Sequence, residues 1–398
     1  MEVHIIRGQN QIGGSIIEVR SSSTKIILDV GSELDETIPV VPKVEGLFQG
    51  EPDYQAVLVS HYHSDHIGLL PNVLSGIPVY MGEKAYSVYQ AAGAWLNRQK
   101  VTASGILRAG EQLIVGDITI LPLLCDHSAF DSYMLQLSCE GRSLLYTGDF
   151  RSTGRKSFQA LLRRLDKVDL LITEGTTLSR PPFKSRTEKE LEAQAVQILS
   201  GTESPAFVLM AATNIDRLVT MFKAAHKVNR VFLEDVYTAS VACAAGNNIP
   251  NPIDFSSIRV FLTTPTEKNY QLLCQYEDKK IGRSGIAGSR FLMCVRPSMQ
   301  RYLEKLSQEV SFSGGILLYS LWDGYREKQE MADFLQFMEE KGVSIVPLHT
   351  SGHAEAAAFD ALIKQTQPEY ILPVHTENAV WFERYKQSKV VYESVFSF

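Results

Sequence analysis

The sequence lacks the patterns that mark a secreted, membrane-spanning or cysteine-stabilised protein. Its five cysteines, at positions 125, 139, 243, 274 and 294, form no Cys-x-x-Cys pair. An odd, scattered set of this kind predicts reduced thiols rather than disulfides or a cysteine-zinc site. No apolar run approaches membrane-spanning length, and the first residues are too polar for a signal peptide. We therefore expect a soluble, cytoplasmic protein with no membrane partner.

Internal repeats and low-complexity segments are also missing, and the composition is that of an ordinary globular protein. Hydrophobic residues make up 44% and charged residues 21% of the 398 positions, which is enough chain for two domains. The net charge of −6 argues weakly against nucleic acid as a partner. Basic residues are nevertheless concentrated between Arg151 and Lys189, where ten Lys or Arg accompany four acidic residues. Such a segment is either a phosphate-binding patch or a solvated face.

The order of apolar stretches predicts two kinds of structure along the chain. The first 150 residues predict mostly short β-strands separated by Gly, Asn and Ser clusters. Strands and helices then alternate, beginning with strand Leu170–Thr173 and helix Glu188–Leu199, and this rhythm is typical of a parallel sheet. The signal is poor between Gly246 and Arg290, and a last helix is expected over Glu377–Tyr385.

Four potential metal ligands lie within the run His61-Tyr62-His63-Ser64-Asp65-His66, directly after an apolar strand. Side chains at i and i+2 of a strand end point the same way, so His61 and His63 are able to share one metal ion. Asp65 and His66 follow as the chain turns, where they can face a second ion. Two adjacent divalent ions generate a hydroxide at neutral pH and clamp both oxygens of a displacement. The run therefore predicts a binuclear metallohydrolase; the alternative is a surface histidine cluster.

Further ligands follow later strands of the predicted sheets. His127, Asp149 and His375 each come just after a predicted strand, where α/β proteins collect their chemistry. A carboxylate can bridge two cations where a histidine cannot, so Asp149 is the expected bridge. Asp29 follows another strand and is either a partner that orients a ligand imidazole or a turn-capping residue.

These residues resemble the motifs of a known family. The order His-x-His-x-Asp-His, His, Asp is similar to that of the metallo-β-lactamase fold. Glu174 in Ile-Thr-Glu-Gly-Thr-Thr, Thr350–Ala354 and Pro373–Glu377 resemble the three motifs of the β-CASP nucleases, and Ala211–Arg217 resembles their Ser-Asn-Ile-x-Arg helix start. The similarity covers nearly the whole chain and is greatest to the RNase J-type ribonucleases of bacteria and archaea.

The resemblance implies an α/β fold with one domain inserted into another. Residues 1–185 and 339–398 would form the metallo-β-lactamase domain, an αββα sandwich of two sheets between outer helices. Residues 186–338 would form the β-CASP domain, built on a parallel α/β sheet.

The resemblance also implies the metals and the residues that bind them. Two zinc ions are expected per chain, with manganese as the alternative. One zinc would be held by His61, His63, His127 and Asp149, and the other by Asp65, His66, Asp149 and His375.

A zinc-dependent ribonuclease for RNA processing or decay follows from this assignment. A metal-bridged hydroxide would attack the phosphorus, with Asp65, Glu174 and His353 as the catalytic residues. His353 would protonate the departing 3′ oxygen, and Glu174 would hold it protonated.

Four further residues are expected to bind substrate phosphates. His349 and Ser351 flank His353, while Thr213 and Asn214 stand at a predicted helix start. Thr213 is expected to cap that helix, with Asp216 completing a capping box.

The alternatives differ in substrate. Related DNA-repair nucleases of the Artemis type have Val in the third motif, whereas His375 favours RNA, most simply a single strand. A DNA-directed β-CASP nuclease, a glyoxalase- or lactonase-like hydrolase and a non-catalytic RNA-binding module remain alternatives. Glu174 and His353 argue against a small substrate, and the complete ligand set argues against a relic site. Enzymes of the RNase J type usually continue into a C-terminal domain used in assembly, whereas this sequence ends 23 residues after His375. The oligomeric state, homo-oligomers included, and the choice between endonuclease and 5′-exonuclease stay open.

Overall fold

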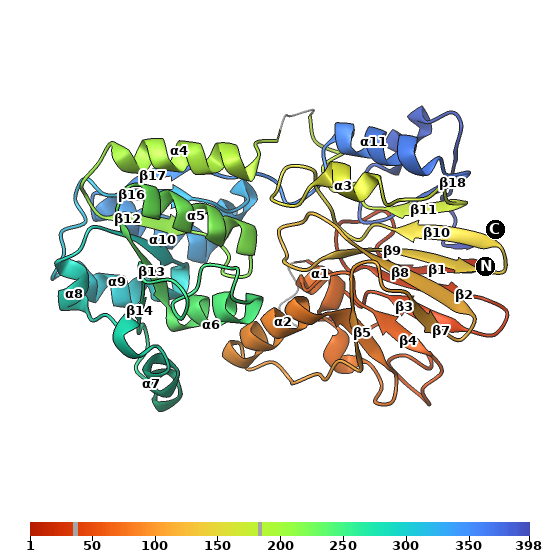
Figure 1. Cartoon of the computed structure of the whole chain (residues 1–398), viewed down its shortest axis with the longest axis horizontal. Coiled ribbons are helices and arrows are strands. Elements are labelled where there is room, and N and C mark those ends of the chain that lie inside the picture. Colours follow the sequence, from red (N-terminus) through yellow and green to blue (C-terminus); the bar gives the residue numbers. More distant parts are fainter. Residues whose placement is uncertain (35–38, 182–184) are drawn as a thin grey trace. The chain divides into compact units, whose positions relative to one another are not determined.

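The chain folds into two compact units (Figure 1). The computed structural model describes residues 1–34, 39–181 and 185–398. Unit 1 comprises Met1–Ser185 and Gly352–Phe398, and unit 2 comprises Arg186–Ser351. We predicted a return to the first domain at residue 339. The chain instead stays in unit 2 through Ser351, because strand β17 (Ser344–Pro347) pairs in parallel with β16 (Ile316–Tyr319) of that unit.

Two seven-stranded sheets form the centre of unit 1. In spatial order the first contains β20 (Val395–Ser397), β1 (Glu2–Arg7), β2 (Ile16–Arg20), β3 (Lys25–Leu28), β4 (Ala56–Leu58), β5 (Val79–Gly82) and β6 (Gly105–Leu107). The second contains β19 (Lys389–Val390), β18 (Tyr370–Pro373), β11 (Leu170–Thr173), β10 (Arg142–Tyr146), β9 (Tyr133–Cys139), β8 (Ile118–Leu124) and β7 (Leu113–Val115). The helices that carry or support the site are α1 (Ser64–Ile67), α2 (Glu83–Trp95), α3 (Phe158–Leu162) and α11 (Ala356–Thr366).

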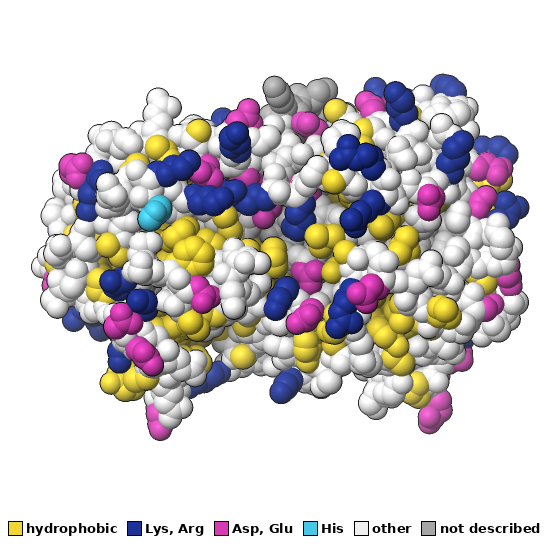
Figure 2. All heavy atoms as spheres, viewed as in Figure 1, with side chains coloured by type: hydrophobic (Ala, Val, Ile, Leu, Met, Phe, Trp, Pro, Cys, Tyr) yellow, Lys and Arg dark blue, Asp and Glu magenta, His cyan; other side chains and the backbone are white. Residues whose placement is uncertain are grey.

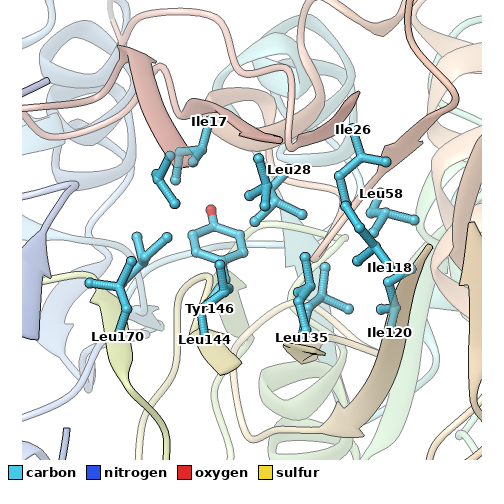
Figure 3. Close-up of a cluster of buried hydrophobic side chains, with 14 of the residues drawn as sticks. Ile17, Ile26, Leu28, Leu58, Ile118, Ile120, Leu135, Leu144, Tyr146 and Leu170 are labelled. Atoms are coloured by element: carbon cyan, nitrogen blue, oxygen red, sulfur yellow. The ribbon is translucent and has the colours of Figure 1, made fainter. Parts of the chain in front are cut away.

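Buried side chains from both sheets form one hydrophobic core (Figure 3). Ile17 and Leu28 of the first sheet face Leu135 and Leu144 of the second, and all four are fully buried. Each such side chain contributes about 1.5–3 kcal/mol through burial. A second cluster, which includes Phe359 on α11, covers the outer face of the second sheet. This arrangement confirms the predicted sandwich and fixes the carboxyl ends of the strands that carry the site.

Unit 2 is built on a six-stranded sheet whose strand pairs are all parallel. Its spatial order is β14 (Ile258–Phe261), β13 (Val231–Asp235), β15 (Phe291–Val295), β12 (Ala206–Leu209), β16 and β17. Its α-helices are α4 (Glu188–Ser200), α5 (Ile215–Lys227), α6 (Val236–Ala245), α7 (Glu267–Cys274), α8 (Arg283–Ala287), α9 (Gln300–Leu306) and α10 (Gln329–Glu340). The parallel sheet confirms the fold class expected from the alternating pattern.

Some short elements differ from the sequence prediction. The helix expected over Glu377–Tyr385 is a 3₁₀ turn, η5 (Ala379–Arg384), in which Phe382 is the only fully buried residue. A single buried side chain does not make the apolar stripe that stabilises a longer α-helix. Strands β6, β7, β19 and β20 were not predicted, because two or three residues at a sheet edge show no periodicity. Among the described residues, no helix combines the length and the apolar character needed to cross a membrane.

Candidate metal centre

The histidine motif lies between the carboxyl end of β4 and helix α1, inside unit 1. His61 and His63 occupy the connecting turn, and Asp65 and His66 lie in α1. His61 and His66 are each only 1% exposed. The Asp65 carbonyl accepts a hydrogen bond from the Ser15 amide at 3.0 Å, which ties the motif to the strands of the first sheet.

Three histidines form the first group of potential metal ligands. One nitrogen from each of His61, His63 and His127 lies within 4.8 Å of the others. His127 follows β8, and its Nε2 is 3.1 Å from Nδ1 of His63. Imidazole nitrogens converge in this way around one tetrahedral ion.

Two carboxylates and two histidines form the second group. Ligand atoms of Asp65, His66, Asp149 and His375 lie within 4.8 Å of one another. His375 Nε2 is 3.1 Å from Asp65 Oδ2, and His66 Nε2 is 3.2 Å from Asp149 Oδ1. Gly148, with φ of 50°, adopts the left-handed turn that presents Asp149 after β10.

The Asp149 carboxylate is 2% exposed and lies beside both groups. Its Oδ2 is 3.8 Å from His61 Nε2. Both carboxylate oxygens and the Nε2 atoms of His61 and His66 make no hydrogen bond to the described residues. Buried polar atoms are normally paired, so this cluster has the donor set and the missing partners expected of a metal site. Although burial opposes ionisation, His375 and His66 hold the pKa of Asp149 well below its usual range.

Burial keeps the first group in its metal-binding form. Burial and the neighbouring His66 and His63 hold the pKa of His61 well below its usual value. Burial beside His61 and His63 has the same effect on the pKa of His127. Burial also lowers the pKa of His63 to about 4. All three imidazoles are therefore neutral near pH 7, as metal ligation requires.

A second layer of polar groups orients the ligand rings. Ser60 Oγ is 3.1 Å from His61 Nδ1, and Thr176 Oγ1 is 2.8 Å from His375 Nδ1. His127 Nδ1 donates to the Gly352 carbonyl at 2.6 Å. Our sequence analysis missed these three partners, although Ser60 directly precedes His61 and Thr176 follows Glu174 by two positions.

Asp29 is fully buried and holds four groups at once. It accepts hydrogen bonds from the amide and hydroxyl of Ser60, each at 2.7 Å, and from the Tyr146 hydroxyl at 2.6 Å. Its Oδ2 also lies 2.7 Å from His66 Nδ1. The carboxylate thereby fixes the His66 ring with Nε2 toward the second group.

Asp29→Ala is expected to lower metal affinity about 10–100-fold, because the His66 ring loses the partner that orients it. Tyr146→Phe removes only one of the four contacts and should lower affinity much less. Competition with a chromophoric chelator measures both values. Equal affinities in the parent and the Asp29 variant would contradict this role.

Glu174 and His353 form a pair next to Asp149. Glu174 is 1% exposed, and it accepts hydrogen bonds from the amides of Phe150 at 3.0 Å and Thr176 at 3.2 Å. His353 Nδ1 lies 3.2 Å from Glu174 Oε2 and 3.6 Å from Asp149 Oδ2. Burial lowers the pKa of His353, but Glu174 and Asp149 outweigh it and raise this pKa to about 9. His353 therefore carries a second ring proton at neutral pH.

The residues predicted to bind phosphate lie in unit 2, whereas the metal-binding groups above belong to unit 1. The predicted cap at Thr213 is wrong. Asn214 caps α5 by accepting a hydrogen bond from the Arg217 amide at 3.0 Å, since the helix starts one residue later than expected. His349 and Ser351 are half-buried and follow β17.

Two parts of the chain match known family models. Residues 26–210 match a β-lactamase superfamily domain, and residues 342–388 match an RNA specificity domain of Zn-dependent metallo-hydrolases. A curated ribonuclease J from Sinorhizobium meliloti is 20% identical over 377 residues, with 88% of this chain aligned. Ribonuclease J 1 from Streptococcus pyogenes is 22% identical over 397 residues, with 94% of this chain aligned. This chain is therefore similar to the β-CASP proteins of the RNase J type. The family expectation is thus confirmed, and the zinc-dependent family supports a metal site at the His/Asp groups.

The RNase J-like chain aligns with only part of its relatives. The alignments span 62% of the Sinorhizobium protein and 68% of the Streptococcus protein. An RNase J-like protein from Methanocaldococcus jannaschii is 27% identical over 212 residues, which cover 49% of this chain and 47% of that protein. A crystal structure of an Enterococcus faecalis protein of unknown function has the same fold, with a TM-score of 0.81 and 18% identity. That match covers 98% of this chain and 97% of the other.

Proposed function

We propose that this RNase J-like protein is a metal-dependent ribonuclease that hydrolyses phosphodiester bonds of single-stranded RNA. The proposal rests on one observation above all: two buried groups of ligand atoms meet beside Asp149, and the Glu174–His353 pair lies next to the same carboxylate. A metal pair supports attack at phosphorus, and a protonated imidazole beside it supports departure of an alkoxide. The curated relatives named ribonuclease J support RNA as the substrate.

We assign two divalent ions to the two groups. His61, His63 and His127 would hold the first, Asp65, His66 and His375 would hold the second, and Asp149 would be shared. Imidazole-rich ligands suit zinc, and the carboxylates also allow manganese. When bound, such a pair lowers the pKa of water and neutralises charge that develops on the phosphate.

His353 and Glu174 would then provide the proton that the leaving 3′ oxygen needs. Glu174 is fixed by two backbone amides and holds the Nδ1 proton of His353. The Nε2 proton of the same ring is the one that His353 would give to the departing 3′ oxygen. A proton from solvent would then restore the charged form of the ring, which Glu174 stabilises.

We also propose which residues of unit 2 bind the RNA strand, and that the protein works in the cytoplasm. In unit 2, Thr213 and Asn214 at the start of α5, with His349 and Ser351 after β17, would bind phosphates of the strand. Unpaired thiols among the described residues, three of them buried, suit a reducing cytoplasm.

Adding zinc to the metal-stripped protein should restore RNA cleavage in proportion to the zinc added, with a plateau at about two ions per chain. The rate of cleavage of a labelled single strand, measured beside elemental analysis of the same samples, checks this. A plateau at one ion would contradict the binuclear centre, and no cleavage at any zinc level would contradict the proposed function.

A further inference from the structure

The turn after β16 in unit 2 carries two exposed aromatic side chains. The 3₁₀ turn η4 (Asp323–Glu327) follows β16, and Trp322 is its N-terminal cap residue. Trp322 is 49% exposed and Tyr325 is 39% exposed, whereas Trp95 and Trp381 are half-buried. Large aromatic side chains normally bury most of their surface, so two neighbouring rings open to solvent are typical of a binding surface. We call Trp322 and Tyr325 the aromatic pair.

The indole of Trp322 is supported from one side. The rings of the aromatic pair meet edge to face, with their centroids 5.6 Å apart and their planes at 82°. A Cβ atom on Gly324 would overlap three atoms of the six-membered ring of Trp322, so the Gly324 backbone covers one face of the indole. Because half of the Trp322 side chain is nevertheless exposed, the other face remains accessible to a flat ligand.

Tyr319 at the end of β16 fixes this turn to the core of unit 2. Its hydroxyl donates a hydrogen bond to the Trp322 carbonyl at 3.1 Å, and the Arg326 guanidinium lies 4.1 Å from the centre of its ring. Arg326 Nε is also 2.6 Å from Asp323 Oδ1, and Tyr319 itself is 1% exposed. The aromatic pair is therefore held in place before a ligand binds, which lowers the entropic cost of binding.

The charges around the aromatic pair balance. The turn and the residue after it carry two acidic and two basic side chains, which are Asp323, Glu327, Arg326 and Lys328. Arg326 is paired with Asp323, and Lys328 Nζ lies 5.2 Å from the centre of the Tyr325 ring. In Figure 2, Lys and Arg side chains instead gather over α3 of unit 1. The turn thus offers a ring face rather than an excess of positive charge, which suits a nucleobase better than a phosphate.

The aromatic pair lies at the edge of the sheet that also carries the proposed phosphate ligands of unit 2. Arg217 of α5 is fully buried and donates hydrogen bonds to the Ser320 hydroxyl and, at 3.4 Å, to the Leu348 carbonyl. The Ser320 hydroxyl donates to the same carbonyl at 2.6 Å. The start of α5, with Asn214, therefore meets the residues that follow β16 and β17. Trp322 comes two residues after Ser320, so it belongs to this edge.

We propose that Trp322 stacks on a nucleobase of the RNA strand, while Tyr325 packs against the indole and keeps it in place. The inference rests on the proposed function, and it adds a base contact to the proposed phosphate contacts. Every base has a π-face, so this contact is independent of sequence. Bases within a duplex already stack on one another, so the aromatic pair favours a single strand.

Fluorescence anisotropy of the zinc-loaded protein with a single-stranded phosphorothioate RNA, which keeps its charges and resists hydrolysis, tests this contact. Trp322→Ala should weaken binding about 5–150-fold, the usual loss for one stacked base. Trp322→Leu keeps an apolar side chain without a ring and should lose nearly as much, whereas Trp322→Phe should keep most of the affinity. The slope of log affinity against log salt should not change, because the substitutions remove no phosphate contact.

Tyr270→Ala is the matched control. Tyr270 is 59% exposed and lies on α7, which follows the opposite edge strand β14 of the same sheet. The variant loses an exposed ring of unit 2 outside the aromatic pair, so it should bind RNA like the parent.

RNAs that lack one base at a time identify the stacked nucleotide. At that position the missing base should weaken binding to the parent but should not weaken binding to Trp322→Ala any further, because both changes remove the same contact. Additive losses at every position would show that Trp322 does not stack on a base, and would overturn the proposal.

Binding, association and cleavage assays separate the possible failures. Equal RNA binding by Trp322→Ala and the parent, or a loss in Trp322→Phe as large as in Trp322→Ala, would overturn the stacking proposal even if natural RNA is cleaved. Self-association of the parent that Trp322→Ala abolishes, with RNA binding unchanged, would assign the aromatic pair to a second copy of the chain and also overturn it. Base-dependent binding through Trp322 without cleavage of natural RNA by the zinc-loaded parent would support the stacking and refute the proposed ribonuclease.

Discussion

Asp149→Ala is expected to abolish RNA cleavage and to lower the metal content of both groups together. Asp149 is the one carboxylate beside both groups, with oxygens 3.2 Å from His66 Nε2 and 3.8 Å from His61 Nε2. Its removal leaves the first group with imidazoles alone and the second group with Asp65 as its single carboxylate, so no anionic side chain remains between the two groups to draw two dications together. Cleavage assays and elemental analysis of the same preparation measure the two effects.

Asp149→Asn and Asp166→Ala are the controls for this experiment. Asn keeps the volume and one oxygen of Asp149 but not its charge. If the charge holds the two ions, Asp149→Asn should lose nearly as much RNA cleavage as Asp149→Ala. Asp166 is exposed and belongs to neither group of potential ligands, so its loss should leave cleavage at the parental rate. Full activity in Asp149→Ala would place the chemistry elsewhere in the molecule.

His353→Ala is expected to slow RNA cleavage by roughly 10²–10⁴-fold, the usual worth of a positioned acid or base. Both metals should stay bound, because we assign His353 to proton donation and not to ligation. An RNA analogue with a 3′-phosphorothiolate leaving group needs no proton, so the variant should cleave it almost as fast as the parent does.

Glu174→Gln provides the matched variant. It keeps the size of Glu174 and one of the two oxygens that accept hydrogen bonds from the amides of Phe150 and Thr176, but it loses the charge that raises the pKa of His353. It should show a smaller loss on natural RNA and the same rescue by the analogue. Equal slowing of both substrates by His353→Ala would show that this residue is not the acid.

The convergence of the potential metal ligands could be predicted from the sequence because each of them follows closely after a strand. The spacing of His61, His63, Asp65 and His66 specifies one short turn, and parallel strands bring their carboxyl ends to one edge. His127, Asp149 and His375 lie at the ends of β8, β10 and β18, so apolar strand patterns were enough to find them.

The supporting contacts could not be predicted, because they join residues far apart in sequence. The Tyr146–Asp29 hydrogen bond spans 117 positions, and the contact from Thr176 to His375 spans 199. Periodicity describes neighbours along the chain and is silent about such pairs. The start of α5 shows the same limit at short range: Thr213 and Asn214 are both good caps, and the local turn selects Asn214.

The most direct test measures the cleavage of a single-stranded RNA of defined sequence by the zinc-loaded protein, with and without a chelator. The RNA is labelled at its 5′ end in one sample and at its 3′ end in another. Strands that carry a 5′-phosphate or a 5′-hydroxyl also distinguish endonuclease from 5′-exonuclease. We expect metal-dependent products with 5′-phosphate and 3′-hydroxyl ends, which disappear when the chelator removes the metal. Intact RNA in every sample, together with rapid turnover of a thioester or lactone by the same preparation, would contradict the proposed function.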